Sequence, residues 1–328
     1  MRLAPCAAAF LFLLFAGTPC GVASPMVASP SSSSAAEREA FLRDVLWEKL
    51  VAMPAGGRPA VGVALSGGGA RGFAHTGVLE ALLYAGFPID RVSGTSMGSV
   101  IGGFYASGMP VKEIWDFGRR TSELKLSRDF GGFSLLKLML TEQLISPKYI
   151  TQVIEDNLGG RDFAGLKTPF ACVAMDFRTG ERILFDEGPL AIAVRASVNL
   201  PGIFAPVEYR HRYLVDGGVV DFIPIDAARS IGAEWVLASV TENSVDEMPS
   251  NVLLSLLQVI DIRGSILAES QEKEADFVVK PRAGGIKVAD FERCVEAGEL
   301  GRAAAWESMD QARDAYILRS AGALLEGL

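Results

Sequence analysis

The chain has 328 residues, of which 49% are hydrophobic and 21% are charged. A chain of this length and composition buries a large core in one or two domains, which excludes an intrinsically disordered protein. The formal net charge of −8, from 31 basic and 39 acidic residues, argues against a non-specific nucleic-acid binder, because such a protein needs a basic surface.

The first 23 residues are typical of a secretory signal peptide. They carry one positive charge at Arg2, an apolar run over residues 7–16, and small residues suited to cleavage near residues 21–23. The apolar run is about half as long as a membrane-spanning helix requires, which disfavours a permanent anchor. A proline directly before Cys20 disfavours lipoprotein anchoring at that cysteine. We therefore expect an exported protein that is either periplasmic or secreted.

Residues 24–58 are expected to form a tether and an N-terminal helix. The Ser/Pro-rich stretch over residues 24–36 has too little apolar content to fold on its own. Residues 37–53 follow with apolar side chains near one helical face, and the sequence PAGGRP then ends the helix.

From residue 60 onward, short apolar runs alternate with helical patterns. The sequence AVGVAL predicts a strand, and the sequence FAHTGVLEALLYAG predicts a helix that ends at Gly86. The runs IDRVS and GSVIGGFYASG predict a second strand and a second helix. Further strands are expected over residues 169–177, 181–186, 212–216 and 234–240. This alternation predicts an α/β fold with a mainly parallel central sheet that helices cover on both faces.

Two segments complete the predicted organisation. Residues 299–328 have the period of one amphipathic helix, which we expect to pack on the body. The apolar residues between 135 and 140 are too dense for a one-sided surface helix, so this segment is either core or a mobile cover that touches lipid. The core domain is expected to span residues 59–229, with residues 230–328 as a C-terminal extension packed on it.

Two cysteines, Cys172 and Cys294, lie beyond the expected signal peptide. Their spacing has no metal or redox signature. In an exported chain they either pair as a disulfide or remain two buried thiols.

The loop GGGARG lies between the first predicted strand and the helix that follows it, and it formally satisfies the dinucleotide fingerprint G-x-G-x-x-G. The acid that this fingerprint requires is misplaced, because Asp90 stands at the start of the next strand rather than at its end. A bound dinucleotide is therefore disfavoured, and no organic cofactor or metal is expected. The backbone N–H groups of the loop can instead converge on a negative oxygen. The residues of this candidate oxyanion hole are Gly67, Gly68, Gly69, Ala70, Arg71 and Gly72.

Two details of this loop stay open. Arg71 either adds positive charge at the oxyanion or holds the loop in place. A tight turn needed only for packing is the alternative to an oxyanion hole.

Ser96 lies in the sequence SGTSMG, at a strand-to-helix junction with glycines on both sides. This context is typical of a nucleophile elbow, in which a sharp turn exposes the serine hydroxyl. The helix that follows directs its N-terminal amides towards the same place, which favours a negative charge there. His75 and His211 are the two histidines of the chain. The first lies inside a helix and the second on a charged strand edge or hairpin, so a Ser-His-Asp triad is disfavoured.

Asp216 follows the predicted strand RYLV and precedes two glycines. On its own, Asp-Gly is a common turn signal. In a parallel sheet, however, active residues gather at the carboxyl ends of the strands. Gly67, Ser96 and Asp216 all lie at or just past such ends, so we expect them to meet.

The ordered motifs GGGARG, GTSMG and DGG, with ASVNLPGIFAPV between the last two, resemble the patatin-like phospholipase family over about residues 61–229. The resemblance implies that Ser96 is the nucleophile, that Asp216 is the base of a Ser-Asp dyad without histidine, and that the loop from Gly67 to Gly72 supplies the oxyanion hole. Residues 276–305 are also similar to the region that follows the catalytic core in bacterial members. Asn199-Leu200 and Asp221 depart from the commonest family pattern and leave the catalytic residues intact.

The resemblance implies a lipid acyl hydrolase of the phospholipase A or lysophospholipase type. Its expected partner is a lipid or phospholipid substrate at a membrane surface, and its oligomeric state is left open. A small-ester or thioester hydrolase is the close alternative, because a serine elbow serves many acyl groups. A non-catalytic lipid-binding protein is the alternative from a different class.

Overall fold

The structure is a computed structural model that describes residues 35–123, 148–241, 248–249 and 252–326. The chain divides into two compact units, Met1–Phe41 and Leu42–Leu328. Helix α1 (Ala35–Val51) crosses this division and confirms the predicted N-terminal helix. The expected signal peptide, most of the tether and the apolar segment at residues 135–140 lie outside the described residues. Among the helices that are described, none has the length and apolar composition to cross a membrane.

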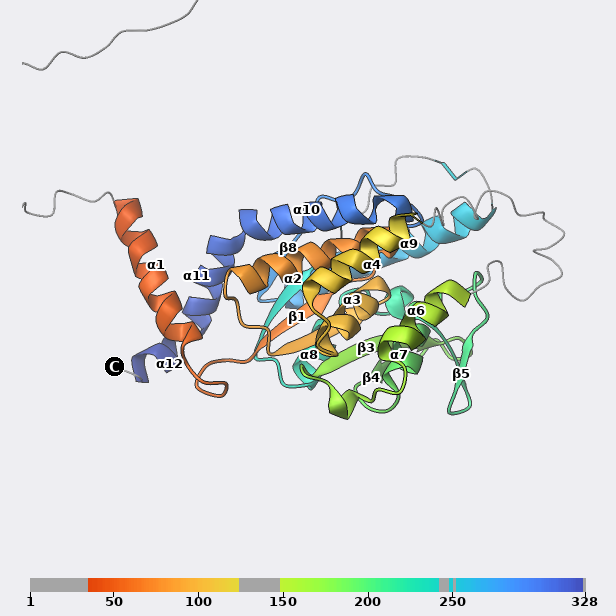
Figure 1. Ribbon diagram of the computed structural model, residues 1–328, viewed down its shortest axis with the longest axis horizontal. Helices are drawn as coiled ribbons and strands as arrows, with labels where there is room; N and C mark the ends of the chain where they lie inside the picture. Colours follow the sequence, from red (N-terminus) through yellow and green to blue (C-terminus); the bar gives the residue numbers. More distant parts are fainter. Residues whose placement is uncertain (1–34, 124–147, 242–247, 250–251, 327–328) are drawn as a thin grey trace, which may run out of the picture. The chain divides into compact units, whose positions relative to one another are not determined.

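One mixed and mainly parallel sheet forms the centre of the second unit (Figure 1), as predicted. Its strand order is β5-β6-β3-β2-β1-β7-β8, and β4 also pairs with β3. The pairs β1–β2, β1–β7, β2–β3 and β7–β8 are parallel, whereas β3–β4, β3–β6 and β5–β6 are antiparallel. The bounds are β1 (Val61–Leu65), β2 (Arg91–Thr95), β3 (Phe170–Asp176), β4 (Arg182–Phe185), β5 (Val207–Tyr209), β6 (Arg212–Asp216), β7 (Trp235–Ser239) and β8 (Phe277–Val279).

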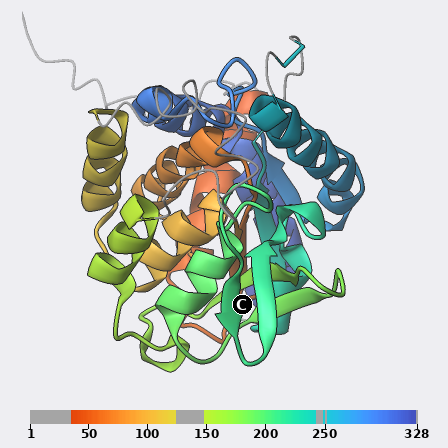
Figure 2. The same cartoon turned by 90° about the vertical axis from the view of Figure 1, so that its right-hand side faces the viewer.

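Helices cover both faces of the sheet (Figure 2). One face carries α2 (Ala74–Tyr84), α3 (Met97–Ala106) and α7 (Leu190–Ser197), with α4 (Val111–Glu123), α6 (Lys148–Leu158) and α10 (Cys294–Glu307) packed outside them. The other face carries α8 (Ile225–Ser230) and α9 (Val252–Gln271). The short 3₁₀ helices are η1 (Gly69–Phe73), η3 (Phe163–Gly165), η4 (Gly217–Val219), η5 (Glu272–Glu274) and η6 (Phe291–Arg293).

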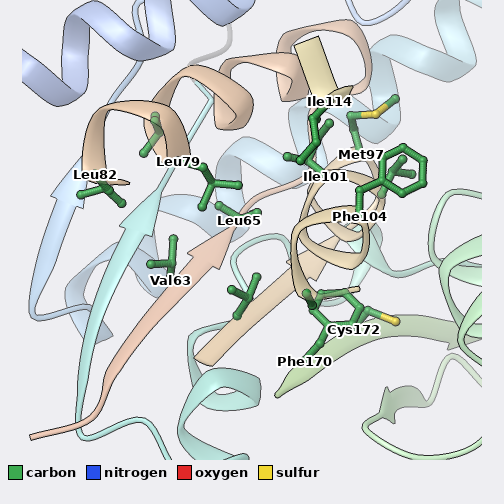
Figure 3. Packing of buried hydrophobic residues seen from close by; sticks show 14 of the residues in the cluster. Val63, Leu65, Leu79, Leu82, Met97, Ile101, Phe104, Ile114, Phe170 and Cys172 are labelled. Atoms are coloured by element: carbon green, nitrogen blue, oxygen red, sulfur yellow. The ribbon is translucent and has the colours of Figure 1, made fainter. Parts of the chain in front are cut away.

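The alternation of side chains along β1 explains the two covered faces. Val63 and Leu65 are fully buried and pack with the side chains of α2 and α3, such as Leu79 and Ile101 (Figure 3). Ala64 points to the opposite face and belongs to a second apolar cluster that includes residues of α8 and α9. A strand that is apolar on both faces is typical of a parallel sheet between two helical layers.

The prediction of one continuous helix over residues 299–328 is wrong. The structure divides this stretch among α10, α11 (Met309–Arg319) and α12 (Ala321–Glu326). The breaks fall at Ser308 and Ser320, and the hydroxyl of Ser308 donates to the carbonyl of Ala304 at 2.8 Å. Such local side-chain bonds offer the backbone an alternative to a continuous helix.

The C-terminal helices share the main core. Helix α10 lies on α2 at glycines, since a Cβ on Gly301 would stand 1.9 Å from the carbonyl oxygen of Ala74. Tyr316 of α11 is fully buried against Phe87 and Trp235. The sheet and its helices therefore continue past residue 229, and the expected division of the chain at that residue stays a prediction.

The cysteine alternatives are resolved by the structure. Cys172 in β3 and Cys294 at the start of α10 are both buried and free. Burial raises the pKa of each thiol, because the thiolate is poorly solvated in an apolar core. Both therefore act as core residues.

Candidate active site

Ser96 occupies a sharp bend between β2 and α3. Its backbone has φ 53° and ψ −127°, a conformation that a residue with a side chain rarely adopts. The flanking glycines make this bend sterically possible. A Cβ on Gly94 would stand 2.3 Å from the carbonyl oxygen of Gly98, and one on Gly98 would stand 2.3 Å from that of Leu65. The predicted strand-to-helix elbow is therefore present.

Asp216 lies against Ser96. The Ser96 Oγ donates a hydrogen bond of 2.6 Å to Asp216 Oδ2, and the backbone N–H of Gly218 donates to Oδ1 at 2.8 Å. Ser96 and Asp216 are both buried, with 9% and 2% of their surfaces exposed. The prediction that these two side chains lie in contact is confirmed.

The reason for this convergence differs from the one predicted. Strand β6 is antiparallel to β3, so Asp216 does not lie at the carboxyl end of a strand that runs parallel to β2. It pairs with Ala174, one residue after Val173, which pairs with Thr95 of β2. The register of β3 with two strands of opposite direction therefore brings the carboxylate beside the bend.

The environment of Asp216 makes its carboxylate an unusually strong base for this residue type. Burial raises its pKa from the ordinary value of 3.8 to about 6, because the charged form loses hydration. The hydrogen bonds from Ser96 and Gly218 act in the opposite direction and limit the rise.

Two amides of the glycine loop are available for a ligand. The N–H of Gly67 donates to Phe222 O at 3.0 Å, and the N–H of Ala70 donates to Val288 O at 2.9 Å. Within the described chain, the N–H groups of Gly68 and Gly69 have no acceptor. Both residues have positive φ, 148° and 55°, which glycine adopts without strain.

Arg71 holds the loop rather than facing the candidate nucleophile. Its side chain is 1% exposed, and its guanidinium forms two hydrogen bonds with the carboxylate of Asp261 in α9, one of them 3.1 Å long. Of the two roles left open by the sequence, the structure favours the positioning role. Ala70, Arg71 and Gly72 lie behind the three glycines that face the cavity.

Neither histidine contacts Ser96. His75 Nε2 donates to Ser66 O at 2.9 Å, so its Nδ1 accepts from the Ser239 hydroxyl, which lies at 2.8 Å. Complete burial lowers the pKa of His75 to about 4, and the neutral ring supports Ser66, the residue directly before the glycine loop. His211 is exposed in the turn between β5 and β6, with φ 64°.

Asp90 has a structural role instead of the ribose-binding role that a dinucleotide site would require. It forms an ion pair with Arg58 at 2.6 Å and accepts from the backbone N–H of Val61 at 2.8 Å. These contacts hold the start of β1, which agrees with the reading against a dinucleotide fingerprint. Among the described residues, no cluster of three histidine, cysteine or acidic side chains is arranged to hold a metal.

Sequence reasoning missed the residues that hold the bend from behind. The Ser96 N–H donates to Ser197 Oγ at 3.0 Å, and that hydroxyl donates to Val173 O at 2.7 Å. Thr241 Oγ1 similarly donates to Gly67 O at 2.8 Å. Ser197 lies in the quoted stretch ASVNLPGIFAPV, but its role depends on a partner about one hundred positions away.

A cavity of about 160 Å³ opens beside these groups. Gly67, Gly68 and Gly69 line it together with Ser96 and Asp216, and most of its remaining wall is apolar. The apolar side chains come from several elements and are Met97, Phe117, Ile150, Val198, Leu200, Ile203, Phe204, Phe222, Leu257, Ile260, Val288 and Phe291. The site therefore combines the Ser96 hydroxyl, the Asp216 carboxylate and the amides of Gly68 and Gly69 with a mainly apolar wall.

The two departures from the family pattern have structural roles. Asn199 donates to Ala205 O at 3.0 Å, and Leu200 lines the cavity. Asp221 accepts from Arg182 Nε at 2.6 Å and from Gln271 Nε2 at 2.8 Å. Burial raises the pKa of Asp221, while Arg182 opposes that rise.

The fold and the site define an α/β protein with a serine elbow, an adjacent aspartate and a glycine loop. Residues 63–229 match the family model of the patatin-like phospholipases. The chain belongs to the patatin-like phospholipase family.

Curated relatives extend the comparison. An uncharacterised NTE family protein of Mycobacterium tuberculosis is 34% identical over 181 residues, which are 55% of this chain and 48% of the relative. The lysophospholipase NTE1 of Scheffersomyces stipitis is 28% identical over 192 residues, which are 58% of this chain and 12% of the relative. The chain thus spans about half the length of the mycobacterial relative and a small part of the yeast one.

Solved structures show a more distant likeness. VipD from Legionella pneumophila has a TM-score of 0.45 at 15% identity, covering 77% of this chain and 67% of that one. Human GIVD cytosolic phospholipase A2 has a TM-score of 0.47 at 14% identity, covering 87% of this chain and 65% of that one. At these values the likeness carries no argument about activity.

The raised pKa of Asp216 predicts that Asp216→Asn stabilises the protein above about pH 6. The folded state binds the Asp216 proton more tightly than the unfolded chain, so the free energy of unfolding falls as pH rises from 3.8 to about 6. The asparagine does not titrate. Its stability advantage should therefore grow to roughly 2–3 kcal/mol above that window. Chemical denaturation at about pH 4 and about pH 7.5 measures it, and an advantage that is equal at both pH values would contradict the prediction.

Proposed function

We propose that this protein is a serine acyl hydrolase that cleaves carboxylic esters of lipids, of the phospholipase A or lysophospholipase type. The single observation that carries the proposal is the 2.6 Å hydrogen bond from Ser96 Oγ to Asp216 Oδ2 on the wall of an apolar cavity. Family membership supports the same chemistry.

In the first half of the proposed reaction, Ser96 Oγ attacks the ester carbonyl carbon while its proton passes to Asp216 Oδ2. Collapse of the tetrahedral intermediate breaks the bond to the leaving alcohol, which takes the proton from Asp216. The products of this half are a free alcohol and an acyl-serine. A carboxylate with a pKa of about 6 is still a weak base for an alcohol. Alignment and stabilisation of the developing anion must therefore supply most of the rate.

The negative oxygen of the intermediate requires donors that are already in place. The N–H groups of Gly68 and Gly69 meet this requirement, because both residues line the cavity beside Ser96 and neither amide donates within the described chain. The N-terminus of α3 begins at Met97 and adds a favourable potential for negative charge. Preorganised donors of this kind contribute on the order of 3 kcal/mol each.

In the second half, water attacks the acyl-serine and transfers a proton to Asp216. Breakdown of this second intermediate releases the fatty acid, and the proton returns from Asp216 to Ser96 Oγ. The cycle uses only these two side chains, the loop amides and water.

The substrate class rests on the cavity wall. Leucine, isoleucine, valine and phenylalanine side chains from several elements and loops line the cavity beside the hydroxyl, and an acyl chain gains free energy when it replaces water against such a wall. The relative from Scheffersomyces stipitis is named a lysophospholipase. A phospholipid or lysophospholipid at a membrane surface is therefore our first choice of substrate.

Experiments distinguish two alternative functions from lipid hydrolysis. A small-ester or thioester hydrolase would lose rate as the acyl chain lengthens, whereas a lipid hydrolase gains rate until the cavity is filled. A non-catalytic lipid-binding protein would bind lipid without releasing fatty acid.

Replacing the nucleophile tests the central claim. Ser96→Ala should lower fatty-acid release from lysophosphatidylcholine by about 10³-fold or more, because among the described residues Ser96 is the one whose hydroxyl donates to the Asp216 carboxylate. A fluorophosphonate should label the wild-type protein at Ser96. The matched control is Ser107→Ala, another buried serine, whose hydroxyl bonds only to Phe104 O. Equal rates for wild type and Ser96→Ala, or labelling at another serine, would refute the dyad.

The pH dependence of the rate tests the base. Asp216 accepts a proton only when ionised, so kcat/KM for a soluble p-nitrophenyl ester should rise with pH and level off above an inflection near its pKa of about 6. A profile that is flat across this pH range, after correction for the uncatalysed reaction, would remove Asp216 from the proton transfer.

We also propose export, on the strength of the first 23 residues. The N-terminal residue of the mature protein, read by mass spectrometry after expression in a bacterium, should lie near residue 24. A mature protein that retains Met1 or Arg2 would show that the segment is not a cleaved signal.

A further inference from the structure

The outward face of α9 carries a row of exposed aliphatic side chains. Val259, Ile262 and Ile266 are 63%, 40% and 56% exposed, and Val252 lies one heptad before Val259 on the same face. Spacings of three, four and seven residues place these side chains in one line along a helix. Figure 2 shows α9 at the margin of the second unit, with no other described helix outside it. Aligned apolar groups of this kind mark an interaction surface more often than scattered ones do.

The opposite face of the same two turns forms part of the cavity wall. Leu257 and Ile260 line the cavity that holds Ser96. Val259 and Ile262 alternate with them along the helix and point outward. The helix is therefore apolar both at the cavity wall and along the exposed row, and Arg263 is the charged side chain on the flank between them.

Helix α9 is also fixed to the site at two points. Asp261 binds Arg71 behind the glycine loop. At the C-terminal end of the helix, Gln271 Oε1 accepts from the backbone N–H groups of Phe222 and Ile223, at 3.1 and 3.0 Å. A surface that holds α9 therefore also holds the cavity next to it.

We propose that this row docks the protein on a lipid bilayer, with α9 lying in the plane of the interface. The inference rests on the proposed lipid hydrolysis and identifies the surface through which the substrate reaches the site. The row from Val252 to Ile266 spans roughly 21 Å at 1.5 Å per residue, a length that suits a helix lying along a membrane surface. An acyl chain that leaves the bilayer would stay in contact with apolar groups until it reaches Ser96.

Size and charge favour a bilayer over a second copy of the chain. Four partly exposed aliphatic side chains fall well short of the roughly 800 Å² per partner that a stable protein interface buries. Arg263 is exposed directly beside the row, and its Nε donates to Val219 O at 3.2 Å. This bond holds the guanidinium at the protein surface, where its terminal nitrogens can meet a lipid phosphate while its stem covers apolar surface. Glu269 is the exposed acidic group at the C-terminal end of the helix. The overall charge of −8 favours a zwitterionic surface over an anionic one.

The test compares vesicle binding of two matched double variants. Val259→Glu with Ile262→Glu places two charges in the row, and Leu318→Glu with Leu325→Glu makes the same change at the exposed surface of α11 and α12. Phosphatidylcholine vesicles are mixed with each protein in the Ser96→Ala background, so that binding is measured without hydrolysis. The α9 variant should lose about ten-fold or more of the apparent partition coefficient. The control should stay within about two-fold of the parent.

Activity measurements complete the design. In the Ser96 background, the α9 variant should release fatty acid from vesicles more slowly in proportion to its lost binding, and should hydrolyse a soluble p-nitrophenyl ester at the wild-type rate. Retained ester hydrolysis also shows that the variant is folded. Loss of activity in Ser96→Ala with no effect of the α9 charges on binding would leave the hydrolase proposal intact and overturn the docking proposal.

Two further results would also overturn docking. One is a failure of the Ser96→Ala protein to bind phosphatidylcholine vesicles. The other is a wild-type dimer in sedimentation velocity that the α9 variant converts to a monomer, because a second copy of the chain would then cover the row.

Discussion

The contact between Ser96 and Asp216 is the constraint on which the rest of the structure depends. A carboxylate with almost no exposed surface is costly, and no cation in the described part of the chain forms an ion pair with it; a hydroxyl and one backbone amide provide its hydrogen bonds. The same burial that raises its pKa gives it the basicity that a proton acceptor requires. Reactivity and folding stability thus impose opposite demands on one side chain.

Several layers hold this contact in place. Ser197 ties the strained bend to β3, and His75 with Thr241 fixes the two residues that precede the free amides. None of these side chains needs to touch a substrate. Their hydrogen bonds determine where the hydroxyl and the amides stand relative to each other, which is the part of such chemistry that depends most on distance.

Much of this arrangement could be predicted from the sequence. The six predicted strands and the elbow at Ser96 depend on local signals, namely apolar runs, glycines that permit close approach, and short spacings. Strands β5 and β8 were not predicted, because segments of three residues give too little periodicity to detect. The continuous C-terminal helix was wrong because the break at Ser308 involves a local side-chain bond to the Ala304 carbonyl that an amphipathic period does not reveal.

Contacts between residues far apart in the sequence were the part of the site that the sequence could not predict. The pairing of Arg71 with Asp261 joins residues 190 positions apart, and no local pattern distinguishes that aspartate from others on α9. The direction of β6 also could not be predicted from a local pattern, because it depends on which strand β6 pairs with. Asp216 was assigned to the right place through an argument about parallel strands, and only the register with Ala174 shows why it arrives there.

The close crossing of α2 and α10 shows how much of this chain is needed to complete its core. The segment that defines family membership ends at residue 229, yet the helix that lies on Ala74 and the tyrosine that fills the space beside Trp235 come from the last forty residues of the chain. The matched segment alone would lack β7 and β8 and would leave the surface of α2 that α10 covers without its partner. The packed core of this chain is therefore larger than the stretch that matches the family model.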